Sequence, residues 1–572
     1  MPDRALNEGW KSGLSVVLPP TLALSLFHSL ANGAFSPLAC VGFLVVLATS
    51  LAGGLLWSSF IDPGDGAPDP LQALLTGMTL LSTLLMLLAF LLPFSAVVNF
   101  FLILAGVCGS QRLARVRAHW DALRFYTTDG WTCGILLVAA GLWSQENLRG
   151  FSTQDTFLQT HQWVDVFFHS VQVGLFANSG GASTLASAVM AHTSVPAYHY
   201  ASYQLPALFS RWAHVSAYSA TTGILAPLGM VWTGLAAHSL GRALAPDRSR
   251  LWGLGAVCAV LLLPDAAYQH LGSHWSSYFF FQGEGLNGPY GIAVLALAWV
   301  HVLDGIRLAR WRPLVAGLFF VALSAFFKFQ ITVAYCVPPV LFLGLFFNRL
   351  SGRGRLGSVA AFLVIYMGTL HWLSGTMPLT PTMALGPSGA LRNVAALISY
   401  APPRQAQLLY LIWPYCTNFT VLLLVGIPLV LIATYGVWIL GVLLLQLGVR
   451  NKASRSLAFF PFLMVAAHLC VALCLKENQG RGDLYEIIHK TFVWPYFAVG
   501  VWMGAVATGV VRDFALRYWP PLLWARAWIP LLVLSLVMVK HWGETTQSGM
   551  ERSEDTMSLR VPRGLFDAGT WL

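Results

Sequence analysis

Apolar segments of membrane-spanning length recur along the whole chain and constrain its fold more than any other feature. Three clear examples are Leu38 to Phe60, Val215 to Leu235 and Phe419 to Leu447. A helix needs roughly 20 apolar residues to cross the hydrocarbon core of a bilayer. In lipid, each segment must also satisfy its own backbone hydrogen bonds. The sequence therefore predicts an all-α fold, a polytopic transmembrane bundle of about 13 to 15 crossings.

The composition supports the lipid bilayer as the main partner of the chain. Of its 572 residues 56% are hydrophobic and 10% charged, which is too apolar for a soluble globular protein. The net charge of +10 is spread over short loops without interleaved aromatic residues, so we expect no nucleic-acid partner. The eight cysteines lie in or beside apolar segments without zinc-like spacing, and this pattern indicates buried small residues.

The basic residues predict which loops face the cytoplasm. Short arginine-bearing loops are retained on that side of a membrane, and each successive pair of these loops leaves room for an even number of crossings. The opposite face then carries the loops at residues 144–212, 265–289, 371–404 and 476–490, and the tail at 541–572. The residues that define the cytoplasmic loops are Arg112, Arg115, Arg117, Arg124, Arg242, Arg248, Arg250, Arg307, Arg310, Arg312, Arg349, Arg353, Arg355, Arg450, Lys452, Arg455, Arg512, Arg517 and Arg526.

Three parts follow from this topology. Residues 1–125 form an N-terminal extension of about four crossings, residues 126–540 form the core, and residues 541–572 form an extracytoplasmic tail. We expect the chain to fold back near Pro93, and the segment from Pro313 to Phe347 to form two helices that meet near Lys328.

The first long extracytoplasmic loop contains the stretch HQWVDVFFHS. In a helix, its residues His161, Asp165 and His169 share one face, since they are four residues apart. This pattern predicts an amphipathic helix at the membrane interface. Asp165 between aromatic side chains could serve as a general base. Two alternatives stay open: a polar face that only meets water, and a His/Asp/His metal site.

Two further loop segments carry polar groups in apolar surroundings. Tyr198 and His199 lie in the Pro-bracketed stretch SVPAYHYASYQLPALF, which is typical either of a sugar or phosphate site or of an interfacial aromatic belt. Glu284, flanked by glycines that allow close backbone approach, belongs either to a ligand site or to an ordinary structured loop.

Basic residues in unexpected places complete the candidates. Lys328 interrupts a long apolar segment, so it should face a cavity, an anion or the interface, unless its side chain snorkels to the headgroups. Lys476, Arg481, His489 and Lys490 gather in one short extracytoplasmic loop, where the positive-inside rule disfavours them. They suit either a phosphate or salt bridges with the three acids of the same loop.

Two short motifs give the chain a resemblance to a known family. DVFFHS (Asp165 to Ser170), followed some 30 residues later by AYHY (Ala197 to Tyr200), is similar to the D-x-x-x-H then Y-H-[FY] pattern of bacterial GT-C-like membrane proteins. The resemblance runs from about Trp131 to Lys540. It implies a GT-C core and a first catalytic loop that carries interfacial helices.

The resemblance also implies an activity. GT-C glycosyltransferases take a sugar from a polyprenyl phosphate, so Asp165 and His169 become the expected catalytic residues, with Asp165 as the base. No cofactor beyond the lipid-linked donor is expected, and a divalent cation is left open. The residues expected to bind substrate or phosphate are Tyr198, His199, Glu284, Lys328, Lys476, Arg481, His489 and Lys490.

The predicted function is therefore transfer of a sugar from a polyprenyl-phosphate donor to an envelope glycan, lipid or protein. We expect this to occur at the outer (periplasmic) face of a bacterial cytoplasmic membrane. One alternative is a transporter or flippase of lipid-linked glycan, which would need broken helices and ionisable residues near mid-membrane. Another is a non-catalytic membrane subunit that uses the same loops for docking.

Overall fold

The computed structural model forms two compact units. Unit 1 comprises Met1–Ala236, Gln282–Tyr290 and Pro530–Leu572, and unit 2 comprises Ala237–Phe281 and Gly291–Ile529. The predicted boundary between residues 125 and 126 falls inside unit 1. The residues that the structure describes are 2–61, 68–92, 94–111, 113–148, 151–153, 157–160, 165–178, 199–245, 247, 249–263, 265–266, 269, 271, 278, 285–347, 352, 357, 360, 382–383, 420, 424–425, 427–449, 455–476, 491–518 and 560–562.

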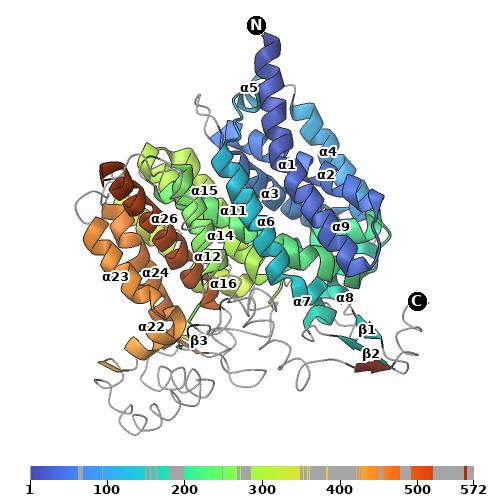
Figure 1. The fold of residues 1–572 in the computed structure, drawn as a ribbon. Helices are drawn as coiled ribbons and strands as arrows, with labels where there is room; N and C mark the ends of the chain where they lie inside the picture. The colour runs from blue at the N-terminus through green and yellow to red at the C-terminus, as the bar shows by residue number, and fades with distance from the viewer. Residues whose placement is uncertain are drawn as a thin grey trace. The chain divides into compact units, whose positions relative to one another are not determined.

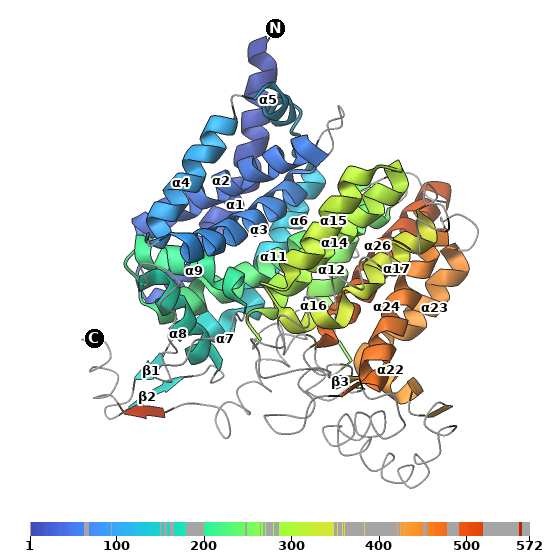
Figure 2. The ribbon, with the colours of Figure 1, turned by 180° about the vertical axis from the view of Figure 1, so that it is seen from behind.

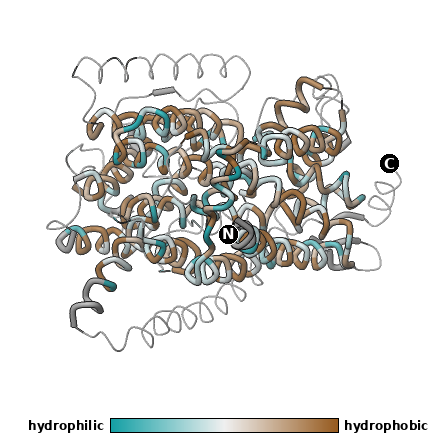
Figure 3. The backbone as a smooth tube through the Cα atoms, turned by 90° about the horizontal axis from the view of Figure 1, so that it is seen from above, coloured by the Kyte–Doolittle hydropathy of each residue, from teal (hydrophilic) through white to brown (hydrophobic). Residues whose placement is uncertain are grey.

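Within these ranges, seven helices are long and apolar enough to cross a membrane. The number rises to eight if the bent pair α4 and α5 forms one span. Figure 3 shows that hydrophobic residues predominate along the helical tubes. The chain is thus a multi-pass helical membrane protein, and the predicted total of 13 to 15 crossings includes segments outside the described ranges. The seven helices are Gly9–Asn32, Pro37–Ile61, Pro70–Leu91, Ala217–Leu244, Gly288–Leu308, Phe329–Phe346 and Val493–Arg512.

Unit 1 is built on a bundle whose first four helices lie side by side (Figures 1 and 2). The predicted fold-back near Pro93 is confirmed, since α3 ends at Leu91 and α4 begins at Ala96. Asp69 caps α3 by accepting hydrogen bonds from two first-turn N–H groups. The helices are α1 (Pro2–Asn32), α2 (Pro37–Ile61), α3 (Pro70–Leu91), α4 (Ala96–Ser110), α5 (Ala114–Asp121), α6 (Thr127–Trp143), α7 (Gln145–Leu148), α8 (Asp165–Asn178), α9 (Tyr200–Trp212), α10 (Ala217–Ala220), the π-helix η2 (Thr221–Leu225) and the start of α11 (Ala226–Leu244).

Each end of this bundle is fixed by aromatic contacts. At the end that carries the predicted cytoplasmic loop, Trp10 of α1 contacts Trp120 of α5 with ring centroids 5.3 Å apart. At the other end α9 packs against α2, α3 and α4, and the ring centroids of Phe209 and Phe43 lie 4.2 Å apart. Helix α9 therefore lies at the end of the bundle predicted to be extracytoplasmic.

A small sheet differs from the all-α prediction. Strands β1 (Phe151–Thr153), β2 (Phe157–Thr160) and β5 (Arg560–Pro562) pair antiparallel in the order β1-β2-β5. Beyond the bilayer, short segments can satisfy their backbone groups between strands, whereas lipid demands helices. The pairing brings the C-terminal tail to the first long loop, as expected if both lie on the same side of the membrane.

In the described part of unit 2, α15 and α16 meet at a short non-helical segment. The prediction that two helices meet near Lys328 is confirmed, since α15 ends at Ser324 and α16 begins at Phe329. A second break lies between α22 and α23 at Gly436, whose φ of +58° suits glycine. The helices are α12 (Arg250–Leu262), α14 (Gly288–Leu308, in unit 2 from Gly291), α15 (Trp311–Ser324), α16 (Phe329–Tyr335), α17 (Val337–Phe346), α22 (Ile427–Tyr435), α23 (Trp438–Val449), α24 (Arg455–Cys474) and α26 (Val493–Tyr518).

The two ends of unit 2 agree with the predicted topology. Arg512 at the end of α26 forms a 2.8 Å salt bridge with Asp247, and Arg307 donates to the carbonyl of Ala243. Three predicted cytoplasmic loops therefore meet at one end. Toward the start of α26, strand β3 (Thr382–Met383) pairs with β4 (Leu475–Lys476) and joins two loops predicted to lie on the other side.

Candidate active site

Helix α8 carries the acidic motif of the first loop and begins at Asp165. Of the three residues expected to share one polar face, only His169 has a described side chain, and it is buried in unit 1, as are Ser170 and Gln172. The apolar Val166, Val173 and Phe176 are buried as well, whereas Phe168 is 43% exposed. Much of the described part of α8 is thus enclosed by unit 1. His161 precedes α8 and lies outside the described residues.

His169 is anchored by a buried chain of hydrogen bonds that joins α8, α9 and the residue before α14. Its Nδ1 lies 2.8 Å from the hydroxyl oxygen of Tyr203. Asn287 donates from Nδ2 to the same oxygen over 2.8 Å. Ser202 contacts Asn287 Oδ1 at 2.8 Å and the carbonyl oxygen of His199 at 2.7 Å. We call His169, Tyr203, Asn287, Ser202 and His199 the buried relay.

Tyr203 is the branch point of the relay. Its hydroxyl oxygen accepts from Asn287 Nδ2 and also lies within hydrogen-bond distance of His169 Nδ1. A hydroxyl has one donor proton and two acceptor lone pairs, so it can pair with either tautomer of His169. All five residues of the relay are buried, so these bonds form without competing water.

His199 confirms that the two sequence motifs come together. It precedes α9 with φ +60° and ψ +24°, a left-handed conformation that is uncommon outside glycine. Its carbonyl accepts hydrogen bonds from both the N–H and the hydroxyl of Ser202, which hold the turn. DVFFHS and AYHY, 30 residues apart in sequence, are thus joined through the buried relay.

Aromatic side chains enclose this part of unit 1. Phe176 of α8 packs edge-on against Tyr200 at 5.1 Å and stacks with Tyr203 at 6.5 Å. Burial in this setting raises the pKa of Tyr200 above its usual value. The relay is consequently held in a rigid apolar setting in which an altered hydrogen bond would be costly.

Lys328 lies in unit 2 and is buried, with 8% of its surface exposed. This burial favours a Lys328 side chain that faces the protein interior over one that snorkels to the headgroups. Its backbone is extended at the break between α15 and α16, and its Cβ lies so close to Gly291 of α14 that a side chain at residue 291 would meet it. A buried ammonium needs compensating polar groups.

The other predicted site residues either lie outside the described residues or have only their backbone described. Strand β4 includes Lys476, and its pairing with β3 joins the late basic loop to the 371–404 loop. For Asp165 and Lys476 the described geometry is that of the backbone. The candidates outside the described residues are Tyr198, Glu284, Arg481, His489 and Lys490.

Tyr203, Ser202 and Asn287 are structural members of the site that the sequence reasoning missed. Tyr203 and Ser202 lie in the same Pro-bracketed segment as His199, and four-residue spacing places Tyr203 one helical turn from it. Asn287 gives no such local sign, since it contacts α9 only through the tertiary fold.

Among the described residues, no group of three or more His, Cys, Asp or Glu side chains could hold a metal ion. The His/Asp/His metal site stays a prediction, because His161 lies outside those residues. No family model, no curated protein and no solved structure matches the chain. The fold itself defines the class: a multi-pass α-helical membrane protein with a polar relay buried in unit 1.

Proposed function

We propose that this protein is a GT-C-type membrane glycosyltransferase that moves a sugar from a polyprenyl-phosphate donor to a cell-envelope glycan, lipid or protein. The observation that supports this best is the hydrogen bond between His169 and Tyr203. It holds the helix that begins at Asp165 against the segment that follows AYHY. An acidic residue on a firmly held helix suits a base that must meet an acceptor hydroxyl with defined geometry.

In the proposed reaction the carboxylate of Asp165 takes the proton from an acceptor hydroxyl. The hydroxyl oxygen then bonds to the anomeric carbon of the sugar, and the bond from that carbon to the phosphate oxygen breaks. The polyprenyl phosphate leaves with the electron pair. His169 is the other catalytic candidate, placed one turn from Asp165 so that its ring can orient the carboxylate or the acceptor.

Cationic side chains would stabilise the departing phosphate. The proposed ligands are Lys328, Lys476, Arg481, His489 and Lys490, while Tyr198, His199 and Glu284 would contact the sugar or the acceptor. Their expected location is the outer face of a bacterial cytoplasmic membrane, following the positive-inside assignment. A divalent cation is a variable for the assay to test.

A specific observation favours a second candidate, a flippase of lipid-linked glycan. In the described part of unit 2, α22 and α23 are interrupted at Gly436, and the buried Lys328 lies beside α14 at the turn between α15 and α16. Interrupted helices are typical of transporter binding sites, and a buried ionisable residue marks a functional site in a membrane protein. The same loops could instead serve as the docking surface of a non-catalytic subunit.

Reconstitution of the purified protein into vesicles separates these candidates. Vesicles would carry a panel of labelled polyprenyl-phosphate sugars, with and without acceptor and Mg²⁺. Label that appears on the acceptor together with free polyprenyl phosphate supports the transferase. Intact donor that only changes leaflet supports the flippase, and neither outcome across the panel supports a subunit role.

A further inference from the structure

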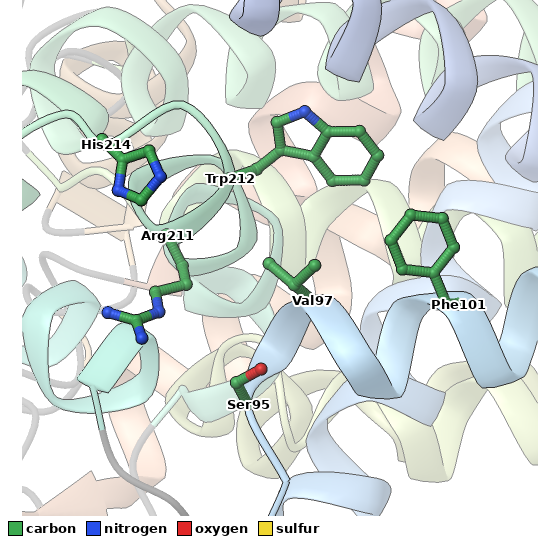
Figure 4. A pocket seen from close by; sticks show the side chains of 6 residues that line it. All are labelled: Ser95, Val97, Phe101, Arg211, Trp212 and His214. Carbon is green, nitrogen blue, oxygen red and sulfur yellow. The ribbon is translucent and has the colours of Figure 1, made fainter.

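A surface pocket of about 350 Å³ lies in unit 1 between the start of α4 and the end of α9 (Figure 4). Arg211, Trp212 and His214 line it from the α9 side, and three residues at the start of α4 line it from the other. The α4 residues are Ser95, Val97 and Phe101. We propose that this pocket binds the phosphate headgroup of a membrane lipid, with the lipid chain lying along α4.

The polar side of the pocket suits an anion. None of the six lining residues is acidic, and both Arg211 and His214 are exposed. Arginine offers a planar set of donors that matches phosphate oxygens. The N-terminus of α4, capped by Ser95, adds the positive end of a helix dipole.

The apolar side suits a lipid chain better than a soluble ligand. Along α4, Val98, Phe101 and Leu102 each expose nearly half of their surface. Trp212 stacks on Phe101 with ring centroids 5.5 Å apart and an interplanar angle of 25°. The polar end of the pocket would contact a lipid headgroup, and the row of exposed apolar side chains beside it would contact the lipid chain.

The turn after α9 is held so that Arg211 and His214 stay at the pocket. Ser210 accepts from the N–H of Val215 at 3.1 Å through its carbonyl and donates to the Val215 carbonyl at 2.8 Å through its hydroxyl. His214 has φ +52°, a left-handed conformation usually taken by glycine after a helix. Fixing the turn lowers the entropy cost of ligand binding.

The position of the pocket argues against an aromatic belt alone. The start of α4 and the end of α9 lie at the end of unit 1 opposite the loop with Arg115 and Arg117, and this end is predicted to be extracytoplasmic. A belt accounts for Trp212 and Phe101, but it does not account for Arg211 on a side where basic residues are disfavoured. A phosphate ligand does account for it.

This inference goes beyond the proposed function, since the pocket would hold its lipid whether or not the protein transfers sugar. Eight residues separate Arg211 from Tyr203 of the relay, which is about 12 Å along a helix axis. The two regions can therefore be altered independently.

Native mass spectrometry of the full-length protein with added lipid tests the proposal. The probes are phosphatidylglycerol, phosphatidic acid, diacylglycerol and inorganic phosphate. We expect Arg211→Gln to weaken binding of both phosphorylated lipids about tenfold, as for loss of a charged hydrogen bond, and Arg211→Lys to weaken it less. Arg117 is also an exposed arginine and lies at the other end of unit 1, so Arg117→Gln should leave the binding unchanged.

Three results would overturn the proposal. The proposal would be overturned if Arg211→Gln and the wild type bound both phosphorylated lipids with equal affinity. It would also be overturned if inorganic phosphate bound as tightly as lipid and this binding depended on Arg211. Diacylglycerol binding that depends on Arg211 would overturn it too. Asp165→Asn should bind these lipids like the wild type, which keeps this test separate from that of the transfer reaction.

Discussion

The Nδ1 atom of His169 and the hydroxyl oxygen of Tyr203 lie 2.8 Å apart in the interior of unit 1, and both side chains are buried. This bond ties α8 to α9 across 34 residues of sequence. Since α8 begins at Asp165, the bond also limits how far the N-terminus of that helix can move. The relay is therefore the element that would give a base at residue 165 a fixed position.

Replacing Tyr203 with phenylalanine should lower stability and activity together. The ring would still fit, but Asn287 Nδ2 and His169 Nδ1 would each lose a buried partner. Leaving a buried polar group unsatisfied costs about 1–3 kcal/mol. We expect a lower thermal unfolding midpoint in detergent than for the wild type. Tyr126→Phe, at a tyrosine that is 51% exposed, provides the control and should change the midpoint little.

An unchanged midpoint for Tyr203→Phe would mean that the relay contributes nothing to holding α8. Asn287→Leu provides an independent second variant, because it removes the link from α9 to the residue before α14 while leaving Tyr203 and His169 in place. It should lower the midpoint in the same direction.

The helical part of the fold follows from the sequence because the bilayer leaves few choices. A long apolar segment can only be a helix in lipid, and prolines or charges mark where it stops. The ends of α2, the turn near Pro93 and the break before Phe329 were all predicted in this way. The strands β1, β2 and β5 were not, because three- and four-residue strands depend on a partner far away in sequence.

The candidate site, like the fold, could be predicted from the sequence only in part. His169 and His199 stand out in sequence because ionisable residues are rare in this chain, and the structure brings them into one hydrogen-bonded relay. Asn287 could not be predicted, since its role depends on a contact across 84 residues with Tyr203. The burial of His169 could not be predicted either, because periodicity identifies a face of α8 but not what covers it.

Close packing of α2 on α3 gives a second prediction. A Cβ at Gly54 would meet the carbonyl oxygen of Ala73 at 1.8 Å, whereas a Cβ at the adjacent Gly53 would meet nothing within 4 Å. Gly54→Ala must push the two helices apart, which typically costs about 1–3 kcal/mol. Gly53→Ala should be neutral or slightly stabilising, since alanine favours helix.

The comparison of these two neighbours needs only their thermal unfolding midpoints in the same detergent. We expect a lower unfolding midpoint for Gly54→Ala and not for Gly53→Ala. Equal effects of the two substitutions would contradict the packing of α2 against α3.

The salt bridge between Asp247 and Arg512 predicts a dependence of stability on pH. Burial raises the pKa of Asp247, but hydrogen bonds from Arg512 and from the N–H of Ser249, together with the charge of Arg512, outweigh it, so the pKa lies below its usual 3.8. A carboxyl whose pKa is lowered on folding stabilises the protein above its unfolded pKa, and this stabilisation is lost as the pH falls through the folded pKa.

A double-mutant cycle of Asp247→Asn and Arg512→Gln measures this coupling. Since both side chains are partly exposed, we expect a coupling of less than about 1 kcal/mol near neutral pH, which salt should reduce. It should disappear once the pH lies below the lowered pKa of Asp247. A coupling that grows on acidification would contradict the assignment.

The substitution of Asp165 by asparagine tests the central claim most directly. It keeps the size of the side chain and removes its ability to accept a proton. Loss of a general base lowers the rate about 10²–10⁴-fold.

The matched control is Asp247→Asn, because Asp247 lies far from Asp165 in the sequence, in a predicted cytoplasmic loop. The measurement is sugar transfer from a labelled polyprenyl-phosphate donor in vesicles, with intact folding checked by gel filtration. The account predicts transfer by the wild type and by Asp247→Asn, and its loss in Asp165→Asn. Undiminished transfer by Asp165→Asn would contradict it.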